Sequence, residues 1–318
     1  MQCDLVIINH GSCREALTAI RSARHHLGPA LADICVVENG TGEADQFRTH
    51  RDAGRRINLI EYRENRGFAS GVNAGVGWSL ERSRHRRPVL VMNPDAYLVD
   101  GRWASFVTWV VGNVGIAAPR VLTPGGDVQA SVYGEPAEHG PWMEALGIQR
   151  WVKSLGISRT MPDHRTDVVA VQGSCFMISP RAWKEVGPFD ERFFLYHEEV
   201  DWCLRARARG FVNIYDPTVS IVHAGGVDVP PGREVLYYTG AVTLIRKHCG
   251  EAAAVRLAAR LKVASRLGAL LARDPARRAG LRELGACLSR PDSPQLEMRA
   301  EDGMPWSLRA RETPEKNP

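Results

Sequence analysis

Three carboxylates stand within four positions of the sequence, at Glu198, Glu199 and Asp201, directly after the aromatic stretch 193–196. Arginines recur at 205–209, so acids and bases match the dipole of a helix over 198–209. Dipole matching does not explain why aromatic residues precede this helix. Carboxylates crowded in a partly apolar site repel one another and tend to have raised pKa values, which suits a general base. The segment therefore predicts a helix that begins with a candidate base.

Two further places in the sequence could bind a cation or an anion. Asp95 follows Asn93 and Pro94 at the end of an apolar strand, where a carboxylate either caps a turn or binds a hard cation. The stretch 64–71, ENRGFASG, is glycine-rich and opens a helix, so its backbone N–H groups could receive a phosphate. It has neither the GxGxxG pattern nor a Walker ending. From these residues alone, the turn cap and the plain helix entry are the favoured interpretations.

The elements that must position these residues alternate along the first 100 residues. Short β-branched runs predict strands at 3–9, 33–38, 57–62 and 88–92, with helices expected at 14–27 and 70–82. This alternation predicts a mostly parallel sheet flanked by helices. Ligands of such sheets bind beyond the carboxyl ends of the strands, where all the loops named above are expected to lie. Later strands are expected at 168–178, 211–215 and 219–222, and helices at 180–186, 198–209 and 233–272.

The composition is that of an ordinary globular protein. The 318 residues are 44% hydrophobic and 24% charged, with 41 Lys and Arg against 36 Asp and Glu. The seven cysteines include no CxxC pair, which predicts a reduced, cytoplasmic protein without a cysteine zinc site. No apolar run approaches the ~20 residues of a spanning helix, and the N-terminus does not read as a signal peptide.

Seven motifs in the right order resemble the inverting family 2 glycosyltransferases of the GT-A fold, most closely their bacterial rhamnosyltransferase-like branch. They cover roughly residues 4–226, and they are VIINHGSCREAL, VVENGTGEAD, ENRGFASGVNAGV, VLVMNPDAYL, GSCFMISPRAW, VGPFDERFFLYHEEVDWCLRARARGF and VHAGG. The resemblance implies a central sheet with a nucleotide-binding half over 1–98 and an acceptor and catalytic half over 99–228. Beyond the resemblance, the residue pattern predicts a helical appendage over 229–290 and a disordered tail over 291–318.

The resemblance also implies the site residue by residue. Glu38 stands where the family has an Asp that contacts the nucleotide base, and Asn93 and Asp95 stand at the metal-binding Asp-x-Asp motif. His223 matches a histidine that completes the metal coordination, and Glu199 matches the catalytic base. The implied contacts to the nucleotide sugar are Asn9, Glu38, Arg66, Gly67, Asn73, Asn93 and Asp95, and those to the acceptor are Gly173, Tyr196 and Trp202.

Three departures from the family pattern keep alternatives open. Glu38 and Glu199 replace Asp, and Gly11 replaces a common Asn. Each Glu reaches about one methylene further than Asp, so Glu198 and Asp201 remain alternatives to Glu199 as the base. A general base must first lie within hydrogen-bond reach of the proton it accepts, and its pKa matters only after that. A strand-end histidine is the alternative for His223, and core packing is the alternative for the rings of Tyr196 and Trp202.

The implied reaction transfers a sugar, with inversion, from a nucleoside diphosphate to an acceptor hydroxyl. Mg²⁺ or Mn²⁺ held by Asp95 and His223 would neutralise the leaving diphosphate. The branch favours dTDP-rhamnose as donor and a UDP-sugar next, with a saccharide, a lipid-linked sugar or a secondary metabolite as acceptor in polysaccharide or cell-wall synthesis. Two alternatives remain. One is a non-catalytic nucleotide-sugar binding protein, and the other is a sugar nucleotidyltransferase, which the absence of a basic phosphate loop near the N-terminus disfavours.

The net charge of +5 is concentrated near the C-terminus. Residues 250–290 hold nine basic and three acidic side chains, a net +6 that leaves −1 for the rest of the chain. Apolar residues from Leu257 to Leu271 recur at helical spacing, with arginines off the stripe. Packing on its own domain or on a second subunit as a homodimer is favoured, and contact with the inner face of an anionic membrane is the alternative. Nucleic acid is not expected as a partner, since no reading motif appears.

Overall fold

The structure of the chain is a computed structural model that describes residues 1–49, 56–137, 139–147, 161–225 and 232–289. It divides into two compact units. The first comprises Met1–Glu135, Ser158–Glu191 and His197–Asp228, and the second comprises Pro136–Ile157, Arg192–Tyr196 and Val229–Pro318. The sequence predicts one continuous domain over 1–228. The first unit differs from it at two places, because 136–157 and 192–196 belong to the second unit. The expected tail at 291–318 lies outside the described residues.

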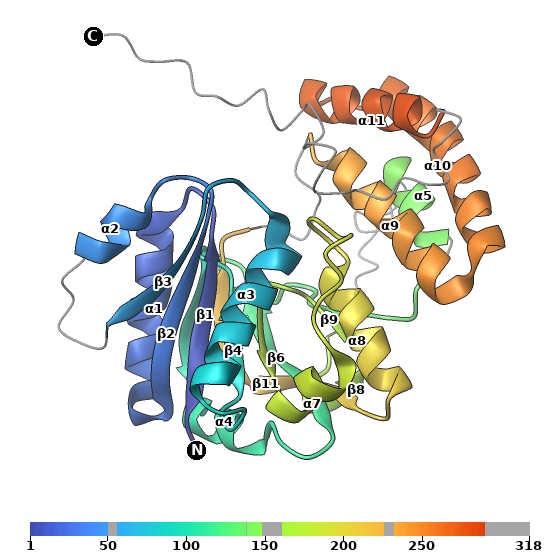
Figure 1. Ribbon diagram of the computed structural model, residues 1–318. Helices are drawn as coiled ribbons and strands as arrows, with labels where there is room; N and C mark the ends of the chain where they lie inside the picture. Colours follow the sequence, from blue (N-terminus) through green and yellow to red (C-terminus); the bar gives the residue numbers. More distant parts are fainter. Residues whose placement is uncertain (50–55, 138, 148–160, 226–231, 290–318) are drawn as a thin grey trace, which may run out of the picture. The chain divides into compact units, whose positions relative to one another are not determined.

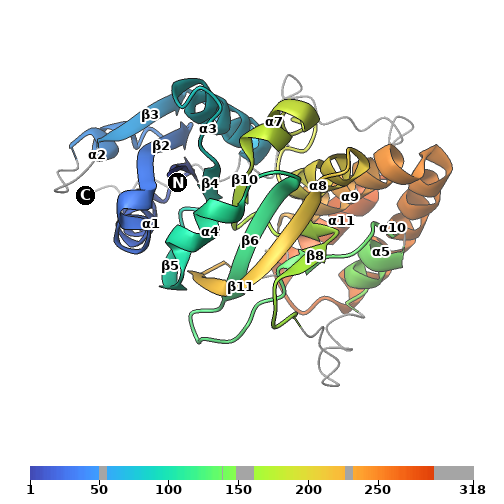
Figure 2. The same cartoon turned by 90° about the horizontal axis from the view of Figure 1, so that it is seen from below.

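The first half of the large sheet is parallel, as the sequence predicts. Its order is β3-β2-β1-β4, from β1 (Cys3–Asn9), β2 (Leu31–Asn39), β3 (Ile57–Tyr62) and β4 (Val89–Met92). The strands are connected by α1 (Cys13–Leu27), the 3₁₀ turn η1 (Gly28–Ala30), α2 (Ala44–Thr49) and α3 (Gly67–Arg82) (Figures 1 and 2). The strands β1 and β4 are buried along their whole length, which explains their near-continuous apolar sequence.

The second half of the sheet is mixed. It contains β5 (Ala96–Gly101), β6 (Val114–Leu122), β8 (Thr166–Val168), β10 (Cys175–Ile178) and β11 (Val212–His223). The strand β10 lies antiparallel between β4 and β6, while β11 is parallel to β6 and antiparallel to β5 and β8. A separate two-stranded sheet pairs β7 (Val132–Tyr133) with β9 (Ala170–Val171). The flanking helices are α4 (Trp103–Trp109), α7 (Pro180–Val186) and α8 (Glu198–Ala208).

Two glycines on α3 allow this helix to approach the sheet closely. A Cβ atom at Gly71 would lie 2.8 Å from Cγ2 of Ile8, and one at Gly75 would lie 2.3 Å from Cγ1 of Val6. Both contacts are shorter than real Cβ atoms allow, so larger residues would push α3 away from β1. The N-terminus of α3, with its glycine-rich approach, is thereby held next to the carboxyl ends of the parallel strands.

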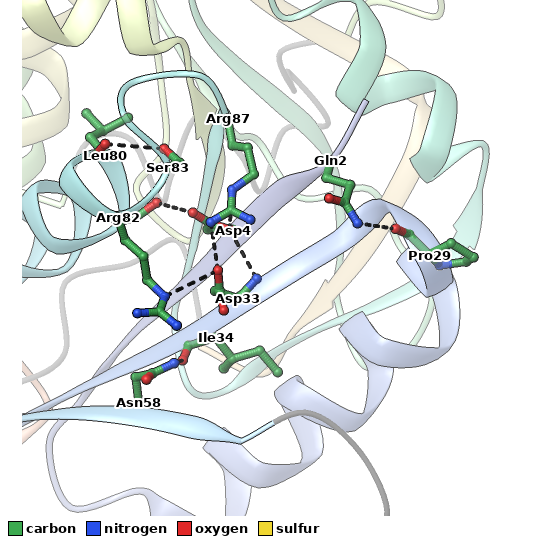
Figure 3. A network of polar contacts seen from close by, with 11 residues as sticks. Gln2, Asp4, Pro29, Asp33, Ile34, Asn58, Leu80, Arg82, Ser83 and Arg87 are labelled. Atoms are coloured by element: carbon green, nitrogen blue, oxygen red, sulfur yellow. Dashed lines mark hydrogen bonds and ion pairs between the residues drawn. The ribbon is translucent and has the colours of Figure 1, made fainter.

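A buried ionic network joins the elements at the opposite, amino end of β1 (Figure 3). The carboxylate of Asp4 is fully buried and accepts hydrogen bonds from Oγ of Ser79 (2.6 Å) and from the backbone N–H of Asp33 (3.1 Å). Arg87 forms ion pairs with Asp4 (3.1 Å) and Asp33 (2.6 Å). Because it ties α3, β1, β2 and the segment that precedes β4 together away from the ligand-binding edge, this network is structural.

The second unit is helical. It contains α5 (His139–Ala145), α9 (Glu234–Cys249), α10 (Glu251–Leu271) and α11 (Pro275–Cys287) (Figure 1). The helix expected over 233–272 is two helices, separated at Gly250 with φ of 90°. Leu257 and Leu261 are buried, whereas Leu267 and Leu271 are exposed, so the expectation that these two leucines pack on their own domain is wrong. None of the helices described has the length and apolar character needed to cross a membrane.

Candidate active site

The loops that leave the parallel strands carry the predicted nucleotide-binding residues. Glu38 ends β2 with a fully buried carboxylate, whose Oε1 accepts a hydrogen bond from the backbone N–H of Thr41 (2.8 Å) and another from the Thr41 hydroxyl. Its Oε2 accepts from the N–H of Gly42 (3.4 Å). The loop's own donors thus satisfy Glu38, so its contact to a nucleotide base stays a prediction.

Asn39 connects this loop to the glycine-rich one. Its amide nitrogen donates to Oδ1 of Asn65 (3.0 Å) and to the carbonyl of Gly67 (3.1 Å), and its amide oxygen accepts from the N–H of Arg66 (2.9 Å). A Cβ atom at Gly40 would lie 2.2 Å from the Glu64 carbonyl carbon, so the two backbones touch. The guanidinium of Arg66 lies 4.8 Å from the ring centroid of Tyr62. Two loops far apart in sequence are therefore held as one rigid surface.

Asn9, at the end of β1, is fully buried and half satisfied. Its amide nitrogen donates to Oε2 of Glu43 (2.8 Å), which also accepts from the backbone N–H of Cys13 (3.2 Å). Within the described residues, Oδ1 of Asn9 has no hydrogen-bond partner. Buried acceptors without a partner are uncommon in native proteins, and a water or a ligand can supply the donor. Glu43 is a residue that the sequence reasoning missed as part of this site.

Asp95 and His223 meet although 128 positions separate them, because His223 at the end of β11 pairs with Ala96 of β5. Nε2 of His223, which is 6% exposed, lies 3.4 Å from Oδ1 of Asp95. Burial alone would raise the pKa of Asp95, but the hydrogen bond from His223 and its charge outweigh burial and lower the pKa. A Cβ atom at Gly225 would lie 2.8 Å from Nε2 of His223 and 3.1 Å from Oδ2 of Asp95, so only glycine fits beside the pair.

Gln129 fixes the orientation of the His223 ring, and the sequence reasoning missed it. Its Nε2 donates to the carbonyl of Gly225 (3.0 Å), which can only accept, so Oε1 faces Nδ1 of His223 at 3.4 Å. Nδ1 then carries a proton, and in a neutral imidazole the Nε2 lone pair faces the carboxylate of Asp95. Two acceptors that face each other in this way need a proton or a metal cation between them. The sequence signal that could have indicated Gln129 is the turn at 123–127, after which the chain runs back along β6.

The residue types of this pair suit Mg²⁺ or Mn²⁺, which accept carboxylate oxygen and, for Mn²⁺ in particular, imidazole nitrogen. Among the residues that the structure describes, no group of three His, Cys, Asp or Glu side chains could hold a metal. Asp95 and His223 would therefore supply two ligands. The remaining positions would be left to a diphosphate and water, as is usual for magnesium bound with phosphates.

Glu199 lies in the first turn of α8 and is 6% exposed. Its Oε1 accepts a hydrogen bond from the backbone N–H of Gly173 (3.2 Å), and its Oε2 has no partner among the described residues. Burial raises the pKa of Glu199 to about 7, against the opposing effect of the backbone N–H groups of Glu199, Gly173 and Val200. A carboxylic acid with a pKa near neutrality is suited to accept a proton.

A short backbone path connects the two halves of the site. The N–H of Asn93, at the end of β4, donates to the carbonyl of Ser174 (2.9 Å), and the next residue back, Gly173, holds Glu199. The antiparallel pairing of β10 with β4 places Cys175 opposite Met92 and so fixes this register. The predicted cation pair and the predicted base therefore lie at the same end of one sheet.

The other two acids of the segment differ in their surroundings. Asp201 is fully buried and forms an ion pair with Nε of Arg205 (2.8 Å), whose guanidinium also donates to the carbonyls of Val186 and Pro188. Asp201 thus anchors α8 to the preceding loop. Glu198 is 3% exposed, and burial together with the charge of Glu199 raises its pKa well above the usual value. The residues just before it, Tyr196 and His197, have φ of 74° and 72°, a strained conformation that is frequent at functional sites.

Three predicted contact residues make contacts within the protein, and a substrate contact by Asn73 or Tyr196 stays a prediction. The ring of Trp202 is fully buried, and its N–H donates to the carbonyl of Gly187 (2.9 Å), so it packs in the core and presents no face to an acceptor. The amide of Asn73 accepts from the N–H of Phe189 (2.8 Å) and donates to its carbonyl (3.0 Å) and to Glu191 (2.8 Å). Tyr196 belongs to the second unit, where its ring lies 5.6 Å from that of Tyr237.

The sequence of the chain is similar to those of known glycosyltransferases. The chain is 30% identical over 204 residues to the low-salt glycan biosynthesis hexosyltransferase Agl10 of Haloferax volcanii, covering 62% of this chain and 61% of that protein. It is 28% identical over 182 residues to an N-acetylglucosaminyl-diphospho-decaprenol L-rhamnosyltransferase of Mycobacterium tuberculosis, covering 52% of this chain and 58% of that protein. The chain thus spans about three fifths of these relatives. No protein-family profile matches it.

A solved structure shares the fold. The crystal structure of GalNAc-T7 with UDP, GalNAc and Mn²⁺ superposes with a TM-score of 0.53 and 11% identity, covering 77% of this chain and 48% of that one. The predicted GT-A fold is therefore confirmed, as is the predicted resemblance to glycosyltransferases that include a rhamnosyltransferase.

Proposed function

We propose that this chain is an inverting glycosyltransferase that moves a sugar from a nucleoside diphosphate to an acceptor hydroxyl with a divalent cation. One arrangement carries the proposal. The predicted cation ligands, Asp95 and His223, and a buried carboxylate with a raised pKa, Glu199, lie at the same end of one sheet. A leaving diphosphate requires neutralisation of its charge, which a cation supplies.

In the proposed reaction, the acceptor oxygen forms a bond to the anomeric carbon while the bond from this carbon to the diphosphate oxygen breaks. The acceptor proton passes to a carboxylate oxygen of Glu199, and the nucleoside diphosphate leaves with the bonding electron pair. Attack opposite the leaving group inverts the anomeric centre. Mg²⁺ or Mn²⁺ bound by Asp95 and His223 would neutralise the diphosphate.

Glu199 is preferred over its neighbours as the base. Asp201 is held by Arg205, so its carboxylate is already engaged in an ion pair. Glu199 is fixed on one oxygen by Gly173 and lacks a partner on the other, and Gly173 adjoins the residue that binds Asn93. A carboxylate oriented through one oxygen leaves the second available for a proton from the acceptor.

For the donor, we propose dTDP-rhamnose first and a UDP-sugar second. The mycobacterial relative is named as an L-rhamnosyltransferase, and the structural neighbour was crystallised with UDP. The nucleoside would lie against the joined loops of Asn39 and Arg66, where Oδ1 of Asn9 lacks a hydrogen-bond donor. For the acceptor, a lipid-linked saccharide is proposed, because the name of that relative specifies a sugar diphosphate on decaprenol.

The test combines donor binding and transfer. Thermal shifts with dTDP, UDP and their sugars, with and without Mn²⁺, identify the nucleotide and the metal requirement, because a ligand of the native state raises the melting temperature. Glu199→Gln should lower transfer about 10²- to 10⁴-fold and leave donor binding unchanged, while the exposed Glu185→Gln serves as control. Unchanged transfer by Glu199→Gln would contradict this assignment of the base. Donor binding without any transfer by the wild type would instead identify a non-catalytic binding protein.

A further inference from the structure

Exposed apolar side chains are concentrated on one helix of the second unit. Of the nine large hydrophobic residues exposed in the described parts of the chain, five lie on α10. We call these five the α10 stripe, and they are Val255 (49% exposed), Val263 (58%), Leu267 (48%), Leu270 (76%) and Leu271 (72%). The spacings of three, four and eight residues place them along one side of the helix. An apolar surface of this kind on a globular protein marks an interaction site.

The fold of the second unit does not need the α10 stripe. The opposite side of α10 is buried through Leu257, Leu261 and Ala264, which belong to a core shared with α9 and α11. At Gly268 a Cβ atom would lie 2.4 Å from the carbonyl oxygen of Ala145, so α10 also packs tightly on α5. The inner face of the helix is therefore complete, and the stripe is a second apolar surface.

Basic side chains accompany the α10 stripe. Arg256, Arg260, Lys262 and Arg266 lie on the same helix, and its acidic residue, Glu251, is at the N-terminal end. Arg266 is exposed and stands between Val263 and Leu267 in the sequence. Arg273 lies two residues beyond the end of the helix and is exposed as well. The surface is thus apolar and cationic together, with the charges at the level of the apolar side chains.

We propose that the α10 stripe docks this protein on the surface of an anionic lipid bilayer. Leucine and valine side chains would enter the boundary of headgroups and acyl chains, and arginines would extend along them to the lipid phosphates. A second copy of the chain is a poorer occupant, because a symmetric contact would bring the same arginines against each other. A neutral apolar partner would offer no counterion to the exposed guanidinium groups of Arg266 and Arg273. The inference stands on α10 alone and does not depend on the transfer reaction.

The experiment measures co-sedimentation of the full chain with vesicles of phosphatidylcholine alone and with 30% phosphatidylglycerol. We expect binding to the anionic vesicles that weakens with added salt. Leu270→Ser combined with Leu271→Ser should reduce the bound fraction on anionic vesicles by at least tenfold. Arg266→Glu combined with Arg273→Glu should do the same, since each basic residue near such a surface contributes about fivefold. The controls are Val111→Ser and Arg86→Glu, which change exposed residues of the first unit.

Three results would overturn the proposal. They are equal binding to neutral and anionic vesicles, binding by the leucine variant that matches the wild type, and a wild-type dimer in solution that the leucine variant converts to a monomer. The last result would assign the stripe to a second copy. Because all four changed residues are exposed, melting temperatures close to that of the wild type are expected and show that the variants are folded. Donor binding is measured on the same preparations. Absence of vesicle binding by the wild type with retained donor binding would then contradict this proposal alone and leave the proposed function unaffected.

Discussion

The backbone N–H of Gly173 donates a hydrogen bond to Oε1 of Glu199 over 3.2 Å, and the adjacent Ser174 accepts one from the N–H of Asn93 over 2.9 Å. A dipeptide thus connects the end of β4 to the first turn of α8. The carboxylate is oriented by main-chain atoms, whose position depends on the pairing of β10 with β4 and not on a flexible side chain. Such support favours a base that is held in place before the substrate binds.

The rate of transfer should depend on pH through Glu199. Burial raises the pKa of this carboxyl to about 7, and only the ionised form can accept the acceptor proton. Below that pH we expect kcat/KM to fall about tenfold per pH unit, with a plateau above it. The measurement is kcat/KM between pH 5 and 9, with Glu185→Gln as a control that should keep the wild-type profile. A profile that is flat from pH 5 to 8 would show that Glu199 is not the base.

Stability should depend on pH in the opposite direction. Because burial raises the pKa of Glu199 in the folded state, the native protein binds this proton more tightly than the unfolded chain does. The associated stability is present below about pH 4.5 and is lost as the pH rises through about 7. Glu199→Gln removes this loss, so we expect it to be more stable than the wild type by about 1–3 kcal/mol at pH 9. At pH 5 the difference should nearly vanish.

Urea denaturation of both proteins at the two pH values gives the required free energies of unfolding. Glu185→Gln, at an exposed position, should show no such pH-dependent difference. Equal stabilities of the wild type and Glu199→Gln at pH 9 would mean that the carboxyl ionises at its ordinary pKa.

Removal of Gln129 should weaken metal binding. Its side chain fixes the ring of His223 through Nδ1, and partners of this kind typically contribute 10- to 100-fold to metal affinity. We expect Gln129→Ala to lower Mn²⁺ affinity by that factor, measured from the free Mn²⁺ signal in electron paramagnetic resonance with nucleoside diphosphate present. Asp127→Ala, an exposed change in the same turn, is the control. An unchanged Mn²⁺ affinity in a folded Gln129→Ala protein would support a structural role for His223.

Asn73 should affect stability rather than donor binding. Its amide satisfies both backbone groups of Phe189, so Asn73→Ala leaves them without partners and should cost about 1–3 kcal/mol in unfolding free energy. The exposed Asn113→Ala should cost less than about 0.5 kcal/mol. Urea denaturation tests this expectation, and donor titration tests the alternative. Weaker donor binding at unchanged stability would restore the nucleoside contact implied by the family resemblance.

Much of the parallel half of the sheet could be predicted, because local patterns encode it. The runs at 3–9 and 57–62 coincide with β1 and β3, and the apolar continuity of 88–92 reflects burial on both faces. The strand β5 was not predicted. It is short, its burial alternates from residue to residue, and it ends in exposed residues at the edge of the sheet, unlike the continuously buried strands.

Sequence motifs also indicated the site residues Asp95, Glu199 and His223, because their residue types and their order match a known family. Their roles in one reaction are proposals that rest on this match and on their common position at one end of the sheet. For Trp202 the sequence misled, since an indole ring looks alike whether it packs in a core or against a sugar. Only its burial and its hydrogen bond to Gly187 decide between the two.

The sequence by itself determined which segments become strands and helices and which side chains end them, because hydrophobic periodicity and turn residues act over short distances. Only the tertiary structure decided which side chains meet. Gln129 reaches His223 across 94 positions, and Gly173 reaches Glu199 across 26. It also decided that α10 buries one apolar face and exposes another. The physical reason is that strand register and helix packing are set by long-range burial, which no local pattern contains.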